Sequence, residues 1–520
     1  MFKSAYGDYK AFAWGHDSLA PLYGAFIDDR NGWGATIVDS LSTMQVMDLQ
    51  DLVDEAVNFT VNIDFSRNNA DYTVSVFEST IRYVGGILSA YELGGKKDSR
   101  LVKKAQELAD KLIYGWVGDN DIPYNELNFT NNKPTIQERV VAVAGTLVLE
   151  WARLSDYTGN ETYRTYAEKS MRRISLLDAP FPGLPVQMVD PSNNKPNGTL
   201  VTWGAGTDSY FEYLIKYGRV TNNADSQWTR TWLTAVDSSI VHLMQEAVGT
   251  NIKGLLYLGD YYNGTLRHIG SHLGCFYGGN WIMGGRLTDN DTIVEYGLRL
   301  TDTCWNTYER TATGLGPEIF AYIGPDGDLA GRVKPTPLDL AYYKENGFYS
   351  YNDTEWAYYD LRPEVIESNF YAWRATGDLK YQKRAEAALS SIEKYCKSEH
   401  GYAGIMDVRF TNQYDYINQT ETFFFAEVLK YLYLTFADPN TIHLDEWVLN
   451  TEAHPLLAPP LLKSYAITQW VAPVEPFALR AIRAAVAETY SAISLKGLAW
   501  ILSIILLATA WRLKPATPII

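Results

Sequence analysis

The chain has 520 residues, of which 46% are hydrophobic and 20% are charged, and its formal net charge is −16. This apolar content is ample for a large folded core and excludes a chain that is disordered throughout. The acidic balance argues against a nucleic-acid partner, because phosphates need a basic surface.

Aromatic residues make up 14% of the chain, with 15 Trp and 37 Tyr. Flat rings often cover the apolar faces of sugars, and they equally pack the core of a helical protein. Composition alone leaves both uses open.

Helical periodicity dominates the chain. Residues 101–116, 141–157, 209–220 and 380–397 place apolar side chains at three-to-four spacing, which predicts amphipathic helices. Long alternating strand patterns are scarce, and a short piece such as 402–408 predicts a small β-hairpin in a loop. We therefore expect an all-α fold with small hairpins between the helices.

A helical hairpin repeats along the chain. Residues 149–170 and 369–388 each contain an aromatic-rich helix that ends at a Thr-Gly pair, and residues 86–109 form a looser copy. The glycine would end one helix so that the next returns antiparallel. Repeated hairpins of this kind stack side by side, either as an open solenoid or as a closed α/α toroid.

No linker divides residues 1–455, which are interpreted as one catalytic-sized domain, with residues 456–520 as a C-terminal appendage. Within the appendage, residues 497–511 are apolar, uncharged and flanked by Lys496 and Arg512. This stretch is shorter than the roughly 20 residues that span a bilayer comfortably. A membrane anchor and a tail without that role both stay open.

Asn-x-Thr sequons indicate a glycosylated protein of the secretory-pathway lumen, in the endoplasmic reticulum or Golgi, membrane-anchored or secreted. Residues 1–17 lack the apolar core of a signal peptide, so we expect a targeting segment to precede this start. Three cysteines allow one disulfide and one free thiol. The sequons begin at Asn58, Asn128, Asn160, Asn197, Asn263, Asn290, Asn352 and Asn418.

Acidic residues recur in stretches that otherwise resemble core helices. Glu78 and Arg82 are four residues apart and share one helical face, where a structural ion pair would explain them. Asp208 follows a Gly-rich turn, where helix capping would explain it. Similar anomalies occur at Glu318, at Arg362, Glu364 and Glu367, at Glu421 and Glu427, and in residues 450–455.

Together these acids exceed what an ordinary core tolerates, because a buried charge is costly unless it is paired. In a toroid, the inner helices would bring them to one central cavity. Facing carboxylates raise one another's pKa. Glycoside hydrolysis needs such an acid and base, and a cluster of oxygens also suits a hard cation.

In their order along residues 1–455, these stretches resemble the class I α-1,2-mannosidases of glycoside hydrolase family 47. The matching segments include WGHDSLAP (14–21), GWGATIVDSL (32–41), VSVFESTIR (74–82), GTDSYFEYLIK (206–216), HLGCF (272–276), TGLGPE (313–318), LRPEVIES (361–368), FFFAEVLKYLYLTF (423–436) and NTEAHP (450–455).

The resemblance implies an (α/α)₇ barrel that is monomeric and holds Ca²⁺ at the floor of its cavity. It implies inverting hydrolysis of terminal α-1,2-linked mannose from high-mannose N-glycans. The alternative is a lectin-like relative that binds mannose in glycoprotein quality control with little turnover. Three departures stand out: the N-terminal signal-anchor is missing, the C-terminal tail has no counterpart, and Gly206 replaces the arginine of the sub-group that removes a single mannose.

The resemblance also implies a role for each matched residue. Glu364 would be the general base, Glu78 or Glu318 would supply the proton, and Asp208 would be a third essential acid. Thr451 would coordinate Ca²⁺ through its side-chain and backbone oxygens, and acids nearby would hold waters around the ion. The remaining substrate-site residues would be Arg82, Glu150, His272, Arg362, Glu367, Phe423, Glu427 and Glu452, and the disulfide would join Cys275 to Cys304.

Overall fold

The computed structural model describes residues 1–466 except 71, 329, 332, 353–354 and 413–414. Most of the expected appendage, including the apolar stretch 497–511, lies outside the described residues. Within the described part, no helix is both long and apolar enough to cross a membrane.

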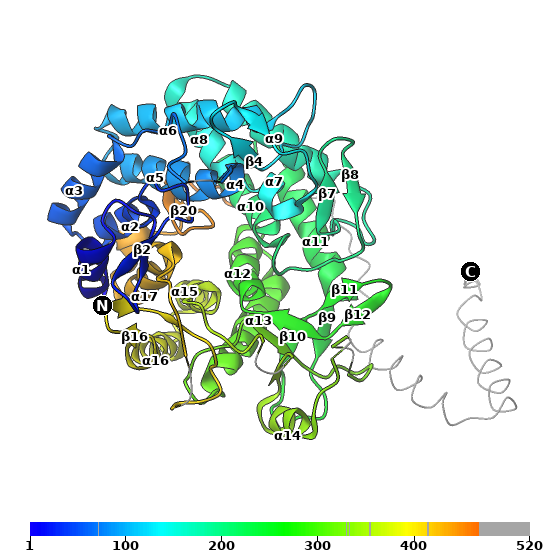
Figure 1. Ribbon diagram of the computed structural model, residues 1–520. Helices are drawn as coiled ribbons and strands as arrows, with labels where there is room; N and C mark the ends of the chain where they lie inside the picture. The colour runs from blue at the N-terminus through cyan, green and yellow to red at the C-terminus, as the bar shows by residue number, and fades with distance from the viewer. Residues whose placement is uncertain (71, 329, 332, 353–354, 413–414, 467–520) are drawn as a thin grey trace, which may run out of the picture. The chain divides into compact units, whose positions relative to one another are not determined.

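Helical hairpins, and one pair of helices from the two ends of the described chain, follow one another around a ring, which Figure 1 shows almost along its axis. In each pair one helix lines the inside of the ring and its partner covers the outside. The pairs, inner helix first, are α2 (Ala35–Val46) and α3 (Gln50–Thr60), α5 (Gly85–Leu93) and α6 (Ser99–Leu112), α8 (Val148–Thr158) and α9 (Thr162–Ser175), α10 (Asp208–Val220) and α11 (Gln227–His242), α12 (Tyr277–Leu287) and α13 (Asp291–Glu309), α15 (Glu364–Thr376) and α16 (Lys380–Tyr395), and α17 (Leu429–Phe436) and α1 (Phe2–Phe12).

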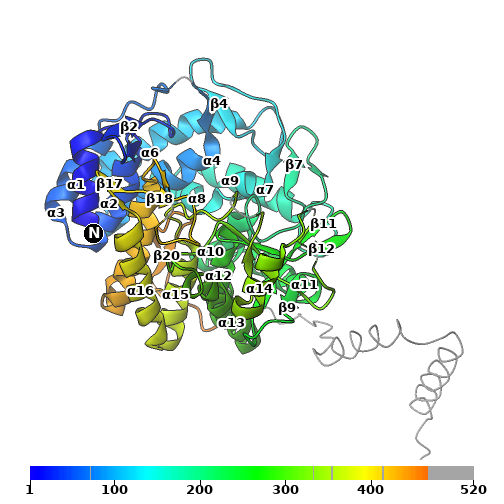
Figure 2. The same ribbon diagram turned by 60° about the horizontal axis from the view of Figure 1, so that its bottom comes forward.

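The ring is closed. Consecutive inner helices contact each other from α2 through α17, and α17 contacts α2 again. At the closure, Phe2 and Tyr6 of α1 pack edge-on against Phe425, which comes just before α17. Figures 1 and 2 both show the first and last helices side by side. The (α/α)₇ barrel is confirmed, and the open solenoid is excluded.

Burial explains which helix lies inside. In α10 every residue from Ser209 to Val220 is buried, whereas α6 buries only one stripe that includes Leu101, Ala105 and Leu108. A helix that is buried all round belongs to the core, and a helix with a single apolar stripe covers it.

The repeated Thr-Gly pairs end inner helices, as predicted. Gly159 after α8 and Gly377 after α15 have φ values of 69° and 67°. Their backbone N–H groups donate to Ser155 and Trp373 carbonyls, both at 2.8 Å. Glycine reaches this left-handed region without steric cost, so the chain can reverse at once into the outer helix.

The strands form small antiparallel hairpins and three-stranded sheets in the connections, as expected. They are β1 (Ser18–Ala20) with β2 (Ala25–Ile27); β3 (Val74–Ser75), β4 (Glu126–Asn128) and β5 (Lys133–Pro134); β6 (Arg139–Val140), β7 (Met188–Asp190) and β8 (Lys195–Asn197); β9 (Met244–Glu246) with β10 (Leu256–Leu258); β11 (Asp260–Tyr262) with β12 (Thr265–Arg267); β13 (Ile269–Ser271), β14 (Ile319–Ala321) and β15 (Tyr349–Ser350); β16 (Lys397–Ser398) with β17 (Gly401–Tyr402); β18 (Gly404–Ile405) with β19 (Tyr416–Ile417); and β20 (Trp447–Leu449) with β21 (Pro455–Leu457).

The last hairpin, β20–β21, lies inside the ring (Figure 1). It contacts α5 and α10, and Ser89 of α5 donates a hydrogen bond to the Pro455 carbonyl at 2.7 Å. Beyond it the chain stays on the barrel, because the Tyr465 backbone N–H donates to the Leu287 carbonyl at 2.8 Å. The turn of this hairpin, residues 450–454, is thereby held within the barrel.

Some elements differ from the sequence prediction. The helix predicted for 141–157 is interrupted at Thr146, which separates α7 (Val141–Gly145) from α8. Gly145, the last residue of α7, packs closely on Tyr210, since a Cβ there would lie 2.6 Å from the Tyr210 ring. Additional elements are α4 (Val76–Glu78), the π-helical segments η1 (Ser79–Val84) and η4 (Phe424–Val428), the 3₁₀ segments η2 (Ile113–Gly115), η3 (Leu273–Phe276) and η5 (Pro439–Ile442), and α14 (Pro337–Asn346).

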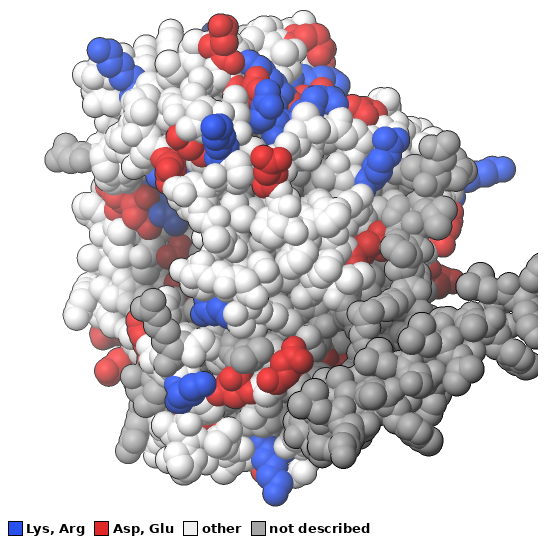
Figure 3. Space-filling model, turned by 90° about the vertical axis from the view of Figure 1, so that its right-hand side faces the viewer, with Lys and Arg blue, Asp and Glu red and all other residues white. Residues whose placement is uncertain are grey.

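The predicted disulfide between Cys275 and Cys304 is present and ties η3 to α13, while Cys396 is free and buried. On the face seen in Figure 3, acidic and basic side chains are interspersed among wide uncharged areas. The described residues of that face therefore present no single-sign field.

Candidate active site

A cavity of about 280 Å³ opens where α10 and α15 begin, beside the turn of the β20–β21 hairpin. Its walls come from segments spread over nearly the whole described chain. The lining residues are Phe77, Glu78, Ile81, Arg82, Val140, Ala142, Val143, Ala205, Gly206, Asp208, Ser209, Glu212, Leu273, Phe276, Arg362, Glu364, Glu367, Phe423, Glu427, Thr451 and Glu452.

Arg82 is the centre of one charged group. Its Nε donates to Glu78 at 2.7 Å, and its Nη1 contacts Glu452 at 2.8 Å and Asp39 at 3.3 Å. Burial opposes ionisation of Glu78, but the charges of Arg82 and Arg30 outweigh it and lower the Glu78 pKa. The predicted Glu78–Arg82 pair is therefore one side of a larger ion cluster.

His272 holds Glu364, and Tyr308 in turn holds His272. His272 Nδ1 lies 2.7 Å from a Glu364 oxygen, and its Nε2 lies 2.7 Å from the Tyr308 hydroxyl. Burial works against the charge of Glu364, but the hydrogen bond and charge of His272, with Arg362, lower its pKa. A carboxylate that is ionised and fixed in orientation can accept a proton from water.

Two acids at the starts of α10 and α15 behave in the opposite way. Burial, with the charges of Glu212 and Glu364, raises the pKa of Asp208 to about 7. Burial and the charge of Glu212 also raise the pKa of Glu367 to about 8. Lys216 forms an ion pair with Glu212 and limits the excess negative charge. The cavity thus holds ionised and partly protonated carboxyls near neutral pH.

An aromatic face completes the cavity. The Phe423 ring lies 5.9 Å from the Arg82 guanidinium and 5.8 Å from that of Arg362. Arg362 in turn donates to Glu318 at 2.7 Å. A flat ring between two hydrogen-bond donors can cover a sugar ring while the donors meet its hydroxyls.

Thr451 lies at the turn of the hairpin. Its backbone N–H faces the Tyr213 hydroxyl at 3.3 Å, and its own hydroxyl has no hydrogen-bond partner among the described residues. Burial and the charge of Glu452 raise the pKa of Glu427 well above its usual value. Threonine oxygens and crowded carboxylates are donors that a hard cation prefers.

The structure gathers the predicted residues in two layers. Glu78, Arg82, Asp208, Arg362, Glu364, Glu367, Phe423, Glu427, Thr451 and Glu452 line the cavity. Glu318 and His272 lie behind it, bonded to Arg362 and Glu364. Glu150 is fully buried and accepts hydrogen bonds from Tyr213 at 2.6 Å and Asn450 at 2.8 Å, which places it behind the turn.

Sequence reasoning did not single out Asp39 and Arg30. Asp39 is fully buried, contacts Arg82 and accepts a hydrogen bond from Thr422. A signal existed, because Asp39 is an isolated acid in the apolar helix α2. Arg30 lies in a loop, where a charge is unremarkable from sequence alone.

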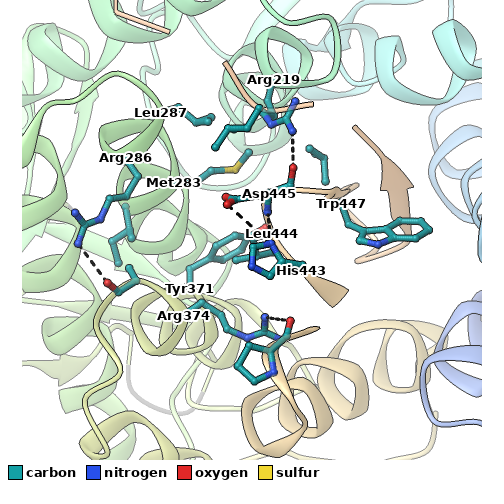
Figure 4. Close-up of a pocket in the computed structure, with 15 residues that line it drawn as sticks. Arg219, Met283, Arg286, Leu287, Tyr371, Arg374, His443, Leu444, Asp445 and Trp447 are labelled. Atoms are coloured by element: carbon teal, nitrogen blue, oxygen red, sulfur yellow. Dashed lines mark hydrogen bonds and ion pairs between the residues drawn. The ribbon is translucent and has the colours of Figure 1, made fainter. Parts of the chain in front are cut away.

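A second cavity, of about 420 Å³, lies at the opposite ends of α10 and α15 (Figure 4). Its arginines are already engaged by backbone carbonyls: Arg219 with Asp445 at 2.7 Å, and Arg374 with Pro439 at 2.9 Å. Trp447 of the hairpin lines this cavity while Thr451 lines the first, so the hairpin separates the two. The acidic cavity is therefore the candidate active site.

Comparison with known proteins agrees with this architecture. The chain matches glycosyl hydrolase family 47 over residues 1–458. It is 36% identical over 477 residues to a probable mannosyl-oligosaccharide alpha-1,2-mannosidase 1B of Aspergillus niger, covering 88% of this chain and 90% of that protein. The Aspergillus oryzae mannosyl-oligosaccharide alpha-1,2-mannosidase 1B is 37% identical over 476 residues, with coverage of 88% and 90%.

Among solved structures, an alpha-1,2-mannosidase from Trichoderma reesei is similar, with a TM-score of 0.84 and 34% identity. The match covers 88% of this chain and 97% of the other. Fold, site and sequence agree, and the chain belongs to glycosyl hydrolase family 47.

Proposed function

We propose that this enzyme removes terminal α-1,2-linked mannose from high-mannose N-glycans, with inversion and with Ca²⁺. One observation carries the proposal: Glu78, Asp208, Glu364 and Thr451, far apart in sequence, line one small cavity beside Phe423. The mannosidase names of its relatives supply the sugar and the linkage.

Glu364 is the base in this scheme. Its lowered pKa keeps it ionised at neutral pH, and His272 fixes its orientation, so it can take a proton from an attacking water. A water on the face of the sugar opposite the leaving group gives inversion.

The proton for the leaving oxygen comes from Glu78 or Glu318. The Glu78 pKa is lowered, so a water that it holds would carry the proton. Glu318 lies behind Arg362, so its proton would also need a water to reach the substrate.

The donor set suits Ca²⁺ at the hairpin turn. Thr451 would hold the ion through its hydroxyl and carbonyl, and Glu364, Glu367, Glu427 and Glu452 would hold waters around it. No group of three His, Cys, Asp or Glu side chains in the described part of the chain could ligate a metal by itself. When bound, Ca²⁺ would orient the sugar hydroxyls and offset the crowded negative charge.

The residue at position 206, which lines the cavity, supports removal of mannose from several positions of the glycan. Gly206 has φ +94°, and a Cβ there would lie 2.7 Å from the Gln187 side chain. Without the arginine of the single-mannose sub-group, we propose that more than one glycan branch is accepted.

We place the protein in the secretory pathway. Several sequon asparagines are exposed, including Asn58, Asn128 and Asn160, so the surface has room for N-linked glycans at these positions. Treating the purified protein with an endoglycosidase should lower its mass.

A time course on a high-mannose glycan, with each product isomer resolved and with chelator in parallel, tests the proposal. We expect released mannose, several intermediate isomers and loss of activity with chelator. Binding of the glycan without release would instead favour the lectin-like alternative.

A further inference from the structure

The loop that carries Arg30 is fixed by a buried carboxylate. Asp17 is 0% exposed, and its oxygens accept backbone N–H bonds from Arg30 at 2.7 Å, Gly32 at 2.6 Å and Trp33 at 3.0 Å. The Arg30 carbonyl accepts a hydrogen bond from the Tyr83 hydroxyl at 2.6 Å. The backbone on both sides of this residue is therefore held in place.

The next residue completes the turn. Asn31 adopts φ 81°, in the left-handed region that asparagine tolerates better than most residues other than glycine. The loop therefore reverses direction directly after Arg30.

The Arg30 side chain faces the acids at the edge of the cavity. Its Nη1 is bound by Asp29 at 3.1 Å, its Nε lies 3.7 Å from Glu78, and its Nη2 lies 3.9 Å from Glu421. The Nε is buried and makes no hydrogen bond among the described residues. The Glu78 Oε2 that lies 3.7 Å from this Nε also accepts a hydrogen bond from Arg82 Nε.

We propose that Arg30 is a positioning residue for the reaction, which holds Glu78 ionised and in place together with Arg82. The inference rests on the proposed function and deepens it, since it names a second cation that acts on a candidate proton-transfer group. Arg30 does not line the cavity, so its effect on the sugar runs through Glu78.

Four charged groups from four segments face Glu78: Arg82 of η1, Arg30 of the loop, Asp39 of α2 and Glu452 of the hairpin turn. The two arginines lower the Glu78 pKa, and Asp39 raises it. Removing the charge of Arg30 therefore raises this pKa. A nearby opposite charge typically shifts a carboxyl pKa by about 1 unit or more.

The test uses Arg30→Gln and Arg30→Lys, with Arg100→Gln as the control. Arg100 pairs with Asp98 at 2.6 Å on the exposed start of α6, so its removal changes the net charge equally, away from the cavity. Mannose release from α-1,2-mannobiose is measured against pH, and the melting temperature is measured for each variant.

In Arg30→Gln we expect about a tenfold loss of kcat/KM with KM little changed, the size expected for coupled neighbours. The limb of the pH profile that reports Glu78 should move upward by about 1 pH unit. The direction is the same whether Glu78 acts as acid or base. In Arg30→Lys this limb should lie close to its wild-type pH, because the positive charge is kept. Arg100→Gln should match the wild type.

If the wild type is active and the pH profile of Arg30→Gln matches that of Arg100→Gln, the inference about Arg30 is overturned and the proposed function is not. A wild type that releases no mannose contradicts the proposed function, and the inference with it. If Arg30→Gln does not fold, a double-mutant cycle of Arg30→Lys with Glu78→Gln decides. If Arg30→Lys lowers kcat/KM in the wild-type background but not in the Glu78→Gln background, the two residues are coupled. An equal loss in both backgrounds overturns the inference.

Discussion

The charge of Glu364 depends on its neighbours rather than on solvent. His272 donates from one side and Arg362 supplies charge from another, so the pKa is lowered even though the group is buried. Charge and orientation of this carboxylate are therefore set before any substrate arrives, which is the condition for an efficient general base.

Glu364→Gln should keep the shape of the site but lose the base. We expect kcat to fall by about 10²-fold or more, while the affinity for a high-mannose glycan stays within a few-fold. Mannose release and glycan binding by calorimetry measure the two effects. The matched control is Glu161→Gln, which removes an exposed acid paired with Arg164. Full activity in Glu364→Gln would remove it as the base.

Thr451→Ala should weaken Ca²⁺ binding, because it deletes a cavity-lining hydroxyl to which no described residue forms a hydrogen bond. The measurement is a calcium titration followed by calorimetry, with thermal unfolding of the chelator-treated protein as a control for folding. A calcium affinity equal to that of the wild type would show that Thr451 is no ligand.

At this scale the sequence predicted pairs that are close along the chain and missed those that are distant. Glu78 and Arg82 were evident from their four-residue spacing. Asp39 and Glu452 both contact the Arg82 guanidinium, yet most of the barrel's sequence lies between them. No local pattern can show that two such residues meet, because their proximity depends on closure of the ring.

Among the elements, the inner helices carry irregular backbone where the charged residues lie. The π-helical turn η1 contains Arg82 and the π-helical turn η4 contains Glu427. Leu361, fully buried just before Arg362, has φ 55°. Such strain costs about 1–3 kcal/mol and is retained where it serves a site.

Glycine substitutions should separate backbone strain from packing. At Gly377, a Cβ would meet nothing within 4 Å, so Gly377→Ala is opposed only by the left-handed φ of 67° and should lower the unfolding free energy by about 1 kcal/mol. At Gly7, inside α1 with equally open space, Gly7→Ala should raise it by about 0.5–1 kcal/mol.

Denaturant unfolding of both variants, with activity as a control for the site, checks these signs. Equal effects at the two positions would mean that the αL cap does not govern the end of α15.

Helix existence was predictable, and helix interruption was not. Residues 209–220 and 380–397 form α10 and α16 almost as predicted, because apolar periodicity survives in isolation. The break between α7 and α8 lies beside the place where Tyr210 packs on Gly145, a tertiary contact that a helical pattern does not reveal. The π-helical turns η1 and η4 were not predicted either.

For the molecule as a whole, ring closure concentrates acids that the chain had kept apart. Glu150 and Glu367 have pKa values raised to about 8, and that of Asp208 is raised to about 7, chiefly by burial. Each binds its proton more tightly when folded, so folding stability falls as pH rises from about 4.5 toward 8. The acids with lowered pKa lose their contribution only below that window.

We therefore expect the chelator-treated protein to melt at a lower temperature at pH 8 than at pH 5.5. Added Ca²⁺ should raise the melting temperature more at pH 8, where the acids are ionised and free to hold the ion's waters. Thermal unfolding by circular dichroism at both pH values, with Mg²⁺ as the control ion, measures this. An equal calcium effect at both pH values would argue against a cation site among these acids.

The most direct test of a mannose-accepting acidic cavity is proton NMR of methyl α-1,2-mannobioside, in which only the released mannose gains a reducing end, during hydrolysis by the wild-type enzyme. Here the first signal of new reducing mannose should be the β-anomer, formed only while Ca²⁺ is present and absent with Glu364→Gln. Appearance of the α-anomer first, or no hydrolysis by a folded and calcium-loaded enzyme, would contradict the account.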